Sequence, residues 1–379
     1  MPKRTFLILA LGCLSGNYAG SSAQPRFQYP AEKLSLGPAF YAQTWRIKDS
    51  TGANRVSAIF TPLRLSIPVT ANFDLDFYGA SAFASLDQGA SQTLNGLVDT
   101  KIRGTIRLND YHWLVQTGVN LPTGKNVLAA GEAQVNNLLA ETVLGFLFKR
   151  YGRGLDFDAG VAYAWSLSEK TKAALGVAYL RKGSYLFRQG DGRRFQPGDE
   201  LTATTTVETQ AERLHFRSNV LAKFFQKDRL DGSTVFQEGV QIEINGEAAF
   251  PLQKWRFALA AKDVIKADNR TFSAGGQNLA ASKDNFPGNI FWLNQQTTYA
   301  FSEKFSVAAS LGLNILGKSD LQLGDAQIFN FGAGTQLKLS ERLIAQTTFS
   351  YSTGEAKDAA ARTFDLQGIF LNTGLRLRY

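Results

Sequence analysis

Strict alternation of apolar and polar side chains, repeated along most of the chain, is the feature that most constrains the fold. In its clearest example, Phe305 to Ile315, every odd position is apolar and every even position is small or polar. Successive side chains of a β-strand point to opposite faces, so this pattern predicts a strand with one apolar face. The same alternation recurs in segments that begin near Phe73, Lys101, Leu155, Leu214 and Val240. No convincing helical period follows the N-terminal segment, and we expect an all-β fold.

The N-terminal residues predict an export signal. Lys3 and Arg4 precede a short apolar run, and Ser21-Ser22-Ala23 fits the small-x-small pattern of a cleavage site. The run is shorter than the about 20 apolar residues that a membrane-spanning helix needs. We expect residues 1–23 to be a signal peptide and residues 24–379 to form a single domain.

A lipoprotein signal that ends at Cys13 is the alternative. It would leave a very short apolar region and would place Leu11 where a small residue is usual. Cys13 is the only cysteine of the chain. Cleavage after Ala23 would therefore leave no cysteine for a disulfide or a zinc site.

A soluble β-sandwich also alternates, and the connections between segments help to separate it from a membrane barrel. Short turns are predicted near residues 69–71, 109–110, 168–170, 251–254, 302–304 and 340–342. Long connections are predicted near residues 86–97, 122–138, 187–200, 267–287 and 353–364. Short turns opposite long loops are typical of outer-membrane barrels. Three of the short turns share Ser-Glu followed by Lys or Arg, which is a weak internal repeat.

Aromatic side chains gather beside the short turns. The chain has 28 Phe, 12 Tyr and 5 Trp but no second long apolar stretch, so a transmembrane helix does not explain them. Those next to predicted turns are Trp113, Trp165, Phe250, Trp255, Phe301 and Phe305. Rings at the membrane–water boundary form the aromatic girdles of membrane barrels. The alternative is that they are core aromatics of a soluble domain.

The C-terminus reads as a last strand, with apolar odd positions from Ile369 to Tyr379 and other residues between them. Within it, Gly374, Leu377 and Tyr379 fit the C-terminal signal that outer-membrane barrels present to the assembly machinery. We therefore expect outer-membrane lipid and the barrel-assembly machinery to be partners.

A sheet can cross hydrocarbon only if every edge is paired, so the strands must close into a barrel. Each strand needs about 9–11 residues, and bacterial single-chain barrels have an even strand number. For a 379-residue chain we expect about 14 strands, with 12 or 16 as the alternatives, and some apolar runs forming hairpins within loops.

Charged residues on the polar faces are the candidate lining of the lumen. They are Arg64, Asp74, Asp76, Lys101, Arg103, Arg107, Asp156, Asp158, Arg217, Lys223, Glu243, Glu247, Arg376 and Arg378. They either pair across the lumen and stiffen a narrow barrel, or line a solvated pore that favours anions and amphipathic acids. The net charge of +9 is dispersed along the chain, whereas a nucleic-acid site would concentrate it, so no nucleic acid is expected.

No catalytic, cofactor or metal site is expected. His112 and His215 are the only histidines, and neither lies near a serine-nucleophile signature. Asp74-x-Asp76 and Asp156-x-Asp158 could ligate calcium, but one polar strand face explains them better. We therefore do not expect an enzyme.

Two segments resemble a known family. Gly96-Leu97-Val98-Asp99-Thr100-Lys101-Ile102 resembles the Gly-Leu-Gly-Asp strand opening of outer-membrane barrels linked to the meta-pathway of phenol degradation. Leu121-Pro122-Thr123-Gly124-Lys125 resembles their Leu-Pro-Thr-Gly segment, and the ending Asn372 to Tyr379 is also similar. These barrels are related to the long-chain fatty-acid transporter group, whose long N-terminal hatch has no counterpart if strands begin near Leu34.

The resemblance implies a barrel of the bacterial outer membrane that gives a passive pathway to small organic solutes, hydrophobic or aromatic ones in particular. A general-diffusion porin, or a structural barrel without a dedicated substrate, is the alternative.

Overall fold

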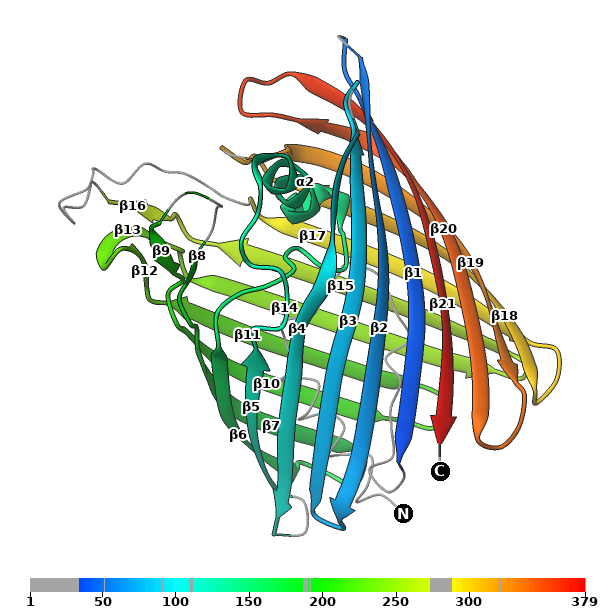
Figure 1. Ribbon diagram of the computed structural model, residues 1–379. Coiled ribbons are helices and arrows are strands. Elements are labelled where there is room, and N and C mark those ends of the chain that lie inside the picture. The colour runs from blue at the N-terminus through cyan, green and yellow to red at the C-terminus, as the bar shows by residue number, and fades with distance from the viewer. Residues whose placement is uncertain are drawn as a thin grey trace.

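A computed structural model describes residues 34–50, 52–89, 91–109, 112–186, 190, 192–272, 288–320 and 322–378. In this part of the chain, sixteen antiparallel strands form a closed barrel, because the last strand returns to pair with the first (Figure 1). The predicted signal peptide, Cys13, Gln24 and Tyr379 lie outside the described residues.

The barrel strands follow one another around the wall in chain order. They are β1 (Ser35–Lys48), β2 (Ala53–Thr70), β3 (Phe73–Asp87), β4 (Ser91–Leu108), β5 (Trp113–Leu121), β6 (Asp156–Ser166), β7 (Thr171–Arg181), β10 (Glu200–Gln210), β11 (His215–Phe225), β14 (Gln241–Leu252), β15 (Trp255–Lys266), β17 (Ile290–Ala300), β18 (Phe305–Leu316), β19 (Gly324–Lys338), β20 (Leu343–Lys357) and β21 (Thr363–Arg378).

Short strands from three of the long connections form a second sheet at the loop end of the barrel (Figure 1). In sheet order they are β16 (Arg270–Thr271), β13 (Ser233–Gln237), β12 (Lys227–Leu230), β9 (Arg194–Gln196) and β8 (Tyr185–Leu186). The β12–β13 hairpin is the kind of hairpin within a loop that the sequence led us to expect.

The expected number of about 14 strands is too low, and the alternative of 16 is the one found. Two predicted long connections, 86–97 and 353–364, are largely strand in the structure. β3 and β4 leave only residues 88–90 between them, and β20 and β21 leave only residues 358–362. The small and polar residues of segments 86–97 and 353–364 suggested loops. In the structure these residues belong to strands that extend beyond the apolar belt of the barrel.

The other predicted long connections do join strands. They span residues 122–155, 182–199 and 267–289, the last including residues outside the described part. A further one, residues 226–240, was not predicted. All lie at the end of the barrel opposite the short turns (Figure 1).

The Ser-Glu-Lys/Arg repeat is a repeated turn geometry. The hydroxyl oxygens of Ser168, Ser302 and Ser340 each accept the backbone N–H groups two and three residues further on, at 3.1–3.3 Å. A serine side chain that satisfies turn N–H groups in this way stabilises the turn locally. The hairpins are therefore determined by short segments of sequence.

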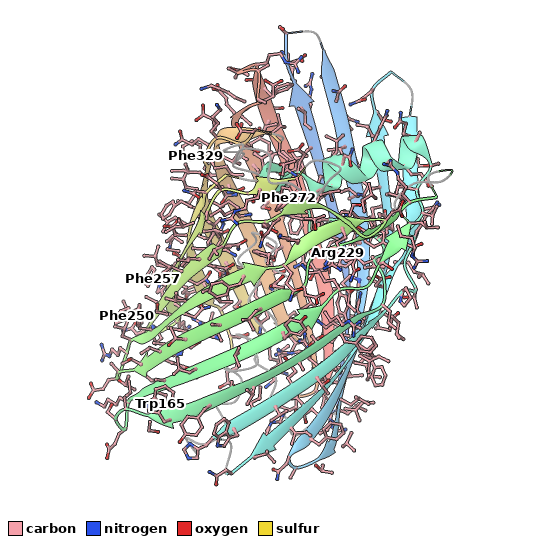
Figure 2. The ribbon with its side chains drawn as sticks, turned by 90° about the vertical axis from the view of Figure 1, so that its left-hand side faces the viewer. Trp165, Arg229, Phe250, Phe257, Phe272 and Phe329 are labelled. Carbon is pink, nitrogen blue, oxygen red and sulfur yellow. The ribbon has the colours of Figure 1, made fainter. Side chains whose placement is uncertain are left out.

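The outer surface carries large exposed apolar side chains from successive strands. Trp165, Phe250, Phe257 and Phe329 lie on this outer surface (Figure 2). Beside the short turns the rings touch one another, Trp113 with Tyr163 at 4.8 Å between centroids. The rings of Trp255 and Tyr299 are also in contact, with 4.6 Å between their centroids. No helix among the described residues is long and apolar enough to cross a membrane.

The apolar face of the long strands changes sides along their length. In β19, Phe329 and Phe331 are exposed on the outside, whereas Ile328, nearer the loop end, is fully buried on the inside. In β21, Ile369 is exposed outside and Leu366 is fully buried inside. The strand ends thus present polar residues to water and apolar residues to a core inside the barrel.

That core is completed by residues 122–155, hereafter the plug, which fold into the loop end of the barrel (Figure 1). The plug contains the helix α2 (Ala130–Ala140) and the 3-10 helix η1 (Thr142–Leu144). The all-β fold class is confirmed, but this short helix was not predicted, because the sequence shows no convincing helical period here. Gly131, Asn136 and Asn137 weaken the helical signal of this short segment.

Candidate functional site: the plug and the inner wall

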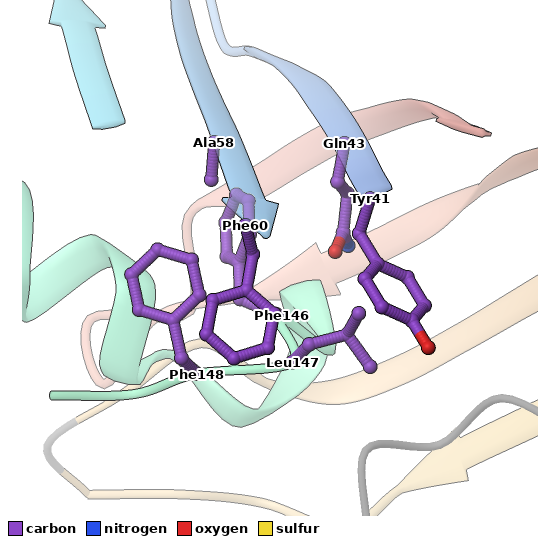
Figure 3. A pocket seen from close by; sticks show the side chains of 7 residues that line it. All are labelled: Tyr41, Gln43, Ala58, Phe60, Phe146, Leu147 and Phe148. Carbon is purple, nitrogen blue, oxygen red and sulfur yellow. The ribbon is translucent and has the colours of Figure 1, made fainter. Parts of the chain in front are cut away.

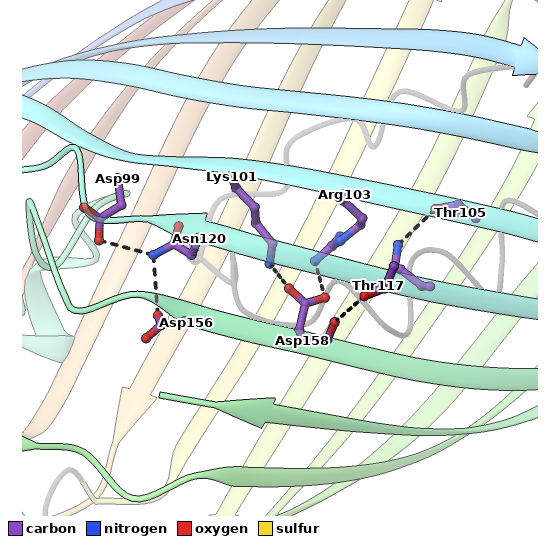
Figure 4. A network of polar contacts seen from close by, with 9 residues as sticks. Asp99, Lys101, Arg103, Thr105, Thr117, Asn120, Asp156 and Asp158 are labelled. Carbon is purple, nitrogen blue, oxygen red and sulfur yellow. Dashed lines mark hydrogen bonds and ion pairs between the residues drawn. The ribbon is translucent and has the colours of Figure 1, made fainter. Parts of the chain in front are cut away.

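Asp99 on β4 holds both ends of the plug. Its Oδ1 accepts the backbone N–H of Gly124 at 2.8 Å, and its Oδ2 accepts that of Arg153 at 2.7 Å. Oδ2 also accepts a hydrogen bond from Asn120 Nδ2 at 3.2 Å, and Asn120 in turn reaches Asp156 at 3.4 Å (Figure 4). One carboxylate on the barrel wall therefore joins the start and the end of the plug.

Glycine is required where these two plug segments cross. A Cβ at Gly124 would lie 2.1 Å from the carbonyl oxygen of Tyr151, and one at Gly152 would lie 2.7 Å from the carbonyl carbon of Gly124. The two segments that carry the family resemblance, residues 96–102 and 121–125, thus meet at the plug anchor. The sequence identified both segments but gave no sign that they would be in contact.

A second anchor joins the plug to the connection between β18 and β19. Gln322 Oε1 accepts hydrogen bonds from the backbone N–H and the hydroxyl of Thr142, and its Nε2 donates to the carbonyl of Ala140. Beside it, Glu141 Oε2 accepts the backbone N–H of Leu323 at 3.0 Å. Burial raises the pKa of the Glu141 carboxyl to about 7, although the Leu323 N–H and nearby Lys149 oppose this shift.

The plug also packs against aromatic residues of the wall (Figure 3). Phe148 stacks on Phe60 with 5.0 Å between ring centroids, and Gln43 Nε2 donates to the carbonyl of Leu144 at 2.7 Å. The recess left between Tyr41, Phe60 and the plug has a volume of about 10 Å³. That is room for one water molecule at most, so this contact is a packed interface.

Below the plug, the inner wall of β2 to β6 carries ion pairs between strands, some of them neighbours and some separated by one strand. Lys101 and Arg103 of β4 face Asp158 of β6 at 3.3 and 3.7 Å (Figure 4). Arg107 pairs with Asp74, and Arg64 pairs with Asp76 at 3.2 Å. These candidate lumen residues are thus brought together as pairs.

The inner wall of β10 to β15 is charged as well. Lys262 pairs with Glu243 at 2.9 Å. Arg217 and Glu247 lie opposite each other on β11 and β14, and Lys223 follows on the same face of β11. At the loop end, Lys182 is 3.7 Å from Glu200, and Lys266 is 3.7 Å from Glu238.

The inner wall of β17 to β21 is different, because nearly all of its residues are uncharged and many of them are small. Ser310, Asn330, Gly332, Ser352 and Asn372 are typical of it, and Ser352 Oγ donates to Asn330 Oδ1 at 2.6 Å. In the described part of these strands, the inner face is charged only at Lys338 and Arg376, near the short turns. The sequence analysis did not predict this difference between a charged and a neutral wall. It could have been found by counting the charged residues at the inward-facing positions of each strand.

The remaining candidates lie at the C-terminal end of the chain, where the sequence predicts a signal for the assembly machinery. The side chain of Arg378 and the whole of Tyr379 lie outside the described residues. Gly374 is on the inner face opposite Gln346, and Leu377 is opposite Leu36 and Leu343 on the neighbouring strands. Their role as an assembly signal stays a prediction.

The two histidines have partners within the barrel. His112 Nδ1 lies 2.7 Å from the carbonyl oxygen of Ala164. His215 Nε2 lies 2.7 Å from Glu208 Oε1. The described residues contain no group of three or more potential metal ligands. The four aspartates considered for calcium contact cations, amides or hydroxyls of the protein instead.

No protein-family model and no curated protein sequence matches the chain. Solved barrels align over most of its length at low identity. OccK1 (OpdK) of Pseudomonas aeruginosa is 9% identical over 91% of this chain and 99% of that chain, with a TM-score of 0.47. A Pseudomonas aeruginosa FadL homologue is 9% identical over 93% of each chain, with a TM-score of 0.45. The CymD monoaromatic hydrocarbon channel is 11% identical over 100% of this chain and 99% of that chain, with a TM-score of 0.44. Scores this low carry no argument about function.

Proposed function

We propose that this protein is a passive channel of the bacterial outer membrane for small organic molecules, in particular hydrophobic or aromatic ones. The observation that carries the proposal is a closed barrel with an apolar outer surface and polar inner walls. Barrels of about 16 strands are wide enough to leave an aqueous channel. A closed sheet with an apolar exterior also satisfies its backbone in lipid.

The preference for hydrophobic or aromatic solutes is supported by the segments that dock the plug, residues 96–102 and 121–125, which contain Asp99 and Gly124. Phe60, Phe146, Phe148 and Tyr151 are buried between the plug and the wall, so they hold the plug in place and do not line the pathway. The two plug-anchoring segments are also those that resemble the phenol-degradation barrels.

A general-diffusion porin is the second candidate. The observation in its favour is the neutral wall of β17 to β21, whose small side chains leave space without offering a specific contact. The two candidates differ in whether hydrophobic solutes permeate faster than polar solutes of the same size.

Conductance and solute uptake together test the proposal. Refolded protein in planar bilayers should give discrete channel currents, and proteoliposomes should take up benzyl alcohol faster than a polar solute of similar mass such as erythritol. Heat-denatured protein is the control. Equal rates for the two solutes would favour the general-diffusion porin. Absence of both currents and uptake would contradict a channel of either kind.

A further inference from the structure

Two arginines lie directly opposite each other on the outer surface of the barrel, at its loop end. Arg46 of β1 is the pairing partner of Arg55 of β2, and both side chains are exposed. Their neighbours along the strands, Trp45, Ile47 and Val56, are buried inside the barrel, so the two arginines point outward. Side chains directly opposite on antiparallel strands have Cβ atoms about 4.5–5.5 Å apart. Both guanidinium groups can therefore reach one ligand.

No ion pair compensates the charge of these two arginines. Asp87 is the β3 partner of Arg55, and Asp365 is the β21 partner of the nearby Lys48. Even so, no carboxylate oxygen of the described residues lies within 4.0 Å of either guanidinium group. Like charges directly opposite on neighbouring strands are destabilising. An anion bound between the two arginines would remove this repulsion.

The pair lies just beyond the apolar belt of the barrel. On β2, the outward-facing residues are mostly apolar from Val69 to Ile59, a length that fits the about 9–11 residues needed to cross hydrocarbon. Arg55 follows on the same face, past Ser57, towards the loop end. In membrane barrels the longer loops lie outside the cell. The two guanidinium groups are therefore at the level of the lipid headgroups of the outer leaflet.

The outer surface between the arginines and the belt suits the rest of a lipid molecule. Thr44 Oγ1 donates a hydrogen bond to Ser57 Oγ at 3.0 Å, so two hydroxyl groups lie next to the arginines. Ile59, Phe83 and Ile369 are exposed apolar side chains of β2, β3 and β21, and Ile59 lies directly opposite Phe83. Headgroup oxygens can hydrogen-bond to the hydroxyls, and an acyl chain can lie against the apolar side chains.

We propose that Arg46 and Arg55 together bind the phosphate group of a lipid of the outer leaflet. The planar guanidinium matches the oxygens of a phosphate and can donate two parallel hydrogen bonds to them. This inference goes beyond the proposed channel function and rests only on the placement of the barrel in the outer membrane. A lipid bound only by the folded barrel also stabilises it by mass action.

Native mass spectrometry of the folded barrel in detergent tests the site. The probes are lipid A, which is a phosphorylated glycolipid, the same lipid after enzymatic removal of its phosphates, and inorganic phosphate. We expect lipid A to be retained, the dephosphorylated lipid to bind more weakly, and inorganic phosphate to be lost. Removing a hydrogen bond to a charged group weakens binding about tenfold or more. Arg46→Gln and Arg55→Gln should each weaken lipid A binding by this factor.

Two variants serve as controls. Arg181→Gln removes an exposed arginine of β7 at the same end of the barrel, where Phe157 and not a second arginine lies opposite. It should bind lipid A as the wild type does. Arg46→Lys keeps the charge but loses the planar group, and it should lose less affinity than Arg46→Gln. Heat-modifiable migration on gels confirms that each variant is folded.

Three results would overturn the phosphate site. They are equal retention of lipid A with and without its phosphates, unchanged affinity in the Arg46→Gln, Arg55→Gln double variant, or an equal loss in Arg181→Gln. Inorganic phosphate retained as tightly as lipid A would contradict a lipid as the ligand. Wild-type dimers that the double variant loses would assign the arginines to an interface between copies of the chain instead.

The outcome for the lipid site is separate from the outcome for the channel. A barrel that conducts but shows any of these contradicting results would retain the channel function and lose the lipid site. A barrel that binds lipid A as expected but never conducts would retain the lipid site and lose the channel function.

Discussion

Gly124 lies at the crossing where the plug docks onto the barrel wall. An alanine Cβ there would lie 2.1 Å from the carbonyl oxygen of Tyr151 and 2.8 Å from the backbone nitrogen of Asp99. Both neighbours are backbone atoms, so Gly124→Ala should displace the plug and break its hydrogen bond to the Asp99 carboxylate. A hydrogen bond to a charged group contributes about 1.5–3 kcal/mol.

We expect amide hydrogens of residues 128–151 to exchange at least about tenfold faster in Gly124→Ala, because each 1.4 kcal/mol is a factor of ten. Gly246→Ala is the matched control, since no atom lies within 4 Å of the Cβ that it would add. Wild-type exchange rates in Gly124→Ala would mean that the plug is not held at this crossing.

At the scale of elements, the contact between η1 and the β18–β19 connection should respond to pH. The pKa of Glu141 is about 7 when the plug is docked, above its ordinary value of 4.5. A carboxyl with a higher pKa in the docked state binds its proton more tightly there, so docking is favoured at low pH. This contribution is complete below pH 4.5 and is lost as the pH rises through about 7. Its size is about 3 kcal/mol at most, at 1.36 kcal/mol for each pKa unit.

Glu141→Gln provides the test, because glutamine can still accept the Leu323 N–H but does not titrate. In the wild type, exchange of the Leu323 amide, corrected for the intrinsic effect of pH, should be better protected at pH 5 than at pH 8. In Glu141→Gln the corrected protection should be the same at both values. A persistent pH dependence in the variant would assign the effect to another group.

The elements differ in how far their own sequence determines them. The turns at Ser168, Ser302 and Ser340 are formed by contacts within four residues, and alternation alone located the strands that they join. The anchor between Thr142 and Gln322 connects residues 180 positions apart, and the crossing of Gly124 with Tyr151 and Gly152 depends on the closed barrel. Contacts of this kind leave no local pattern, which is why the sequence predicts only a long connection near residues 122–138 and does not predict the helix within the plug.

For the molecule as a whole, the alternation of apolar and polar residues predicted a closed barrel. It did not predict that the apolar face of the long strands changes from the outside to the inside along their length. Leu366 and Ile369 lie three residues apart on β21, and one is buried inside while the other is exposed outside. From sequence alone the loop-end segments looked like connections, because their outer residues are polar. The inward-facing positions of the same segments, such as Ala356 and Leu366, are apolar because they pack in the core that the plug completes inside the barrel.

The outer surface gives the sharpest test of the membrane assignment, on two neighbouring residues of β21. Leu371 lies on the outer face opposite Ala42 and Phe349, whereas Asn372 lies on the inner face opposite Tyr41 and Thr348. An arginine that faces lipid within the membrane costs about 2–4 kcal/mol, and one that faces the lumen can remain hydrated. Leu371→Arg should therefore reduce the yield of heat-modifiable, membrane-inserted protein far more than Asn372→Arg. Both variants add the same side chain to the same strand, so composition and local propensity are matched. Equal yields would mean that the outer face of β21 does not meet lipid, and the barrel would have to be placed in an aqueous environment instead.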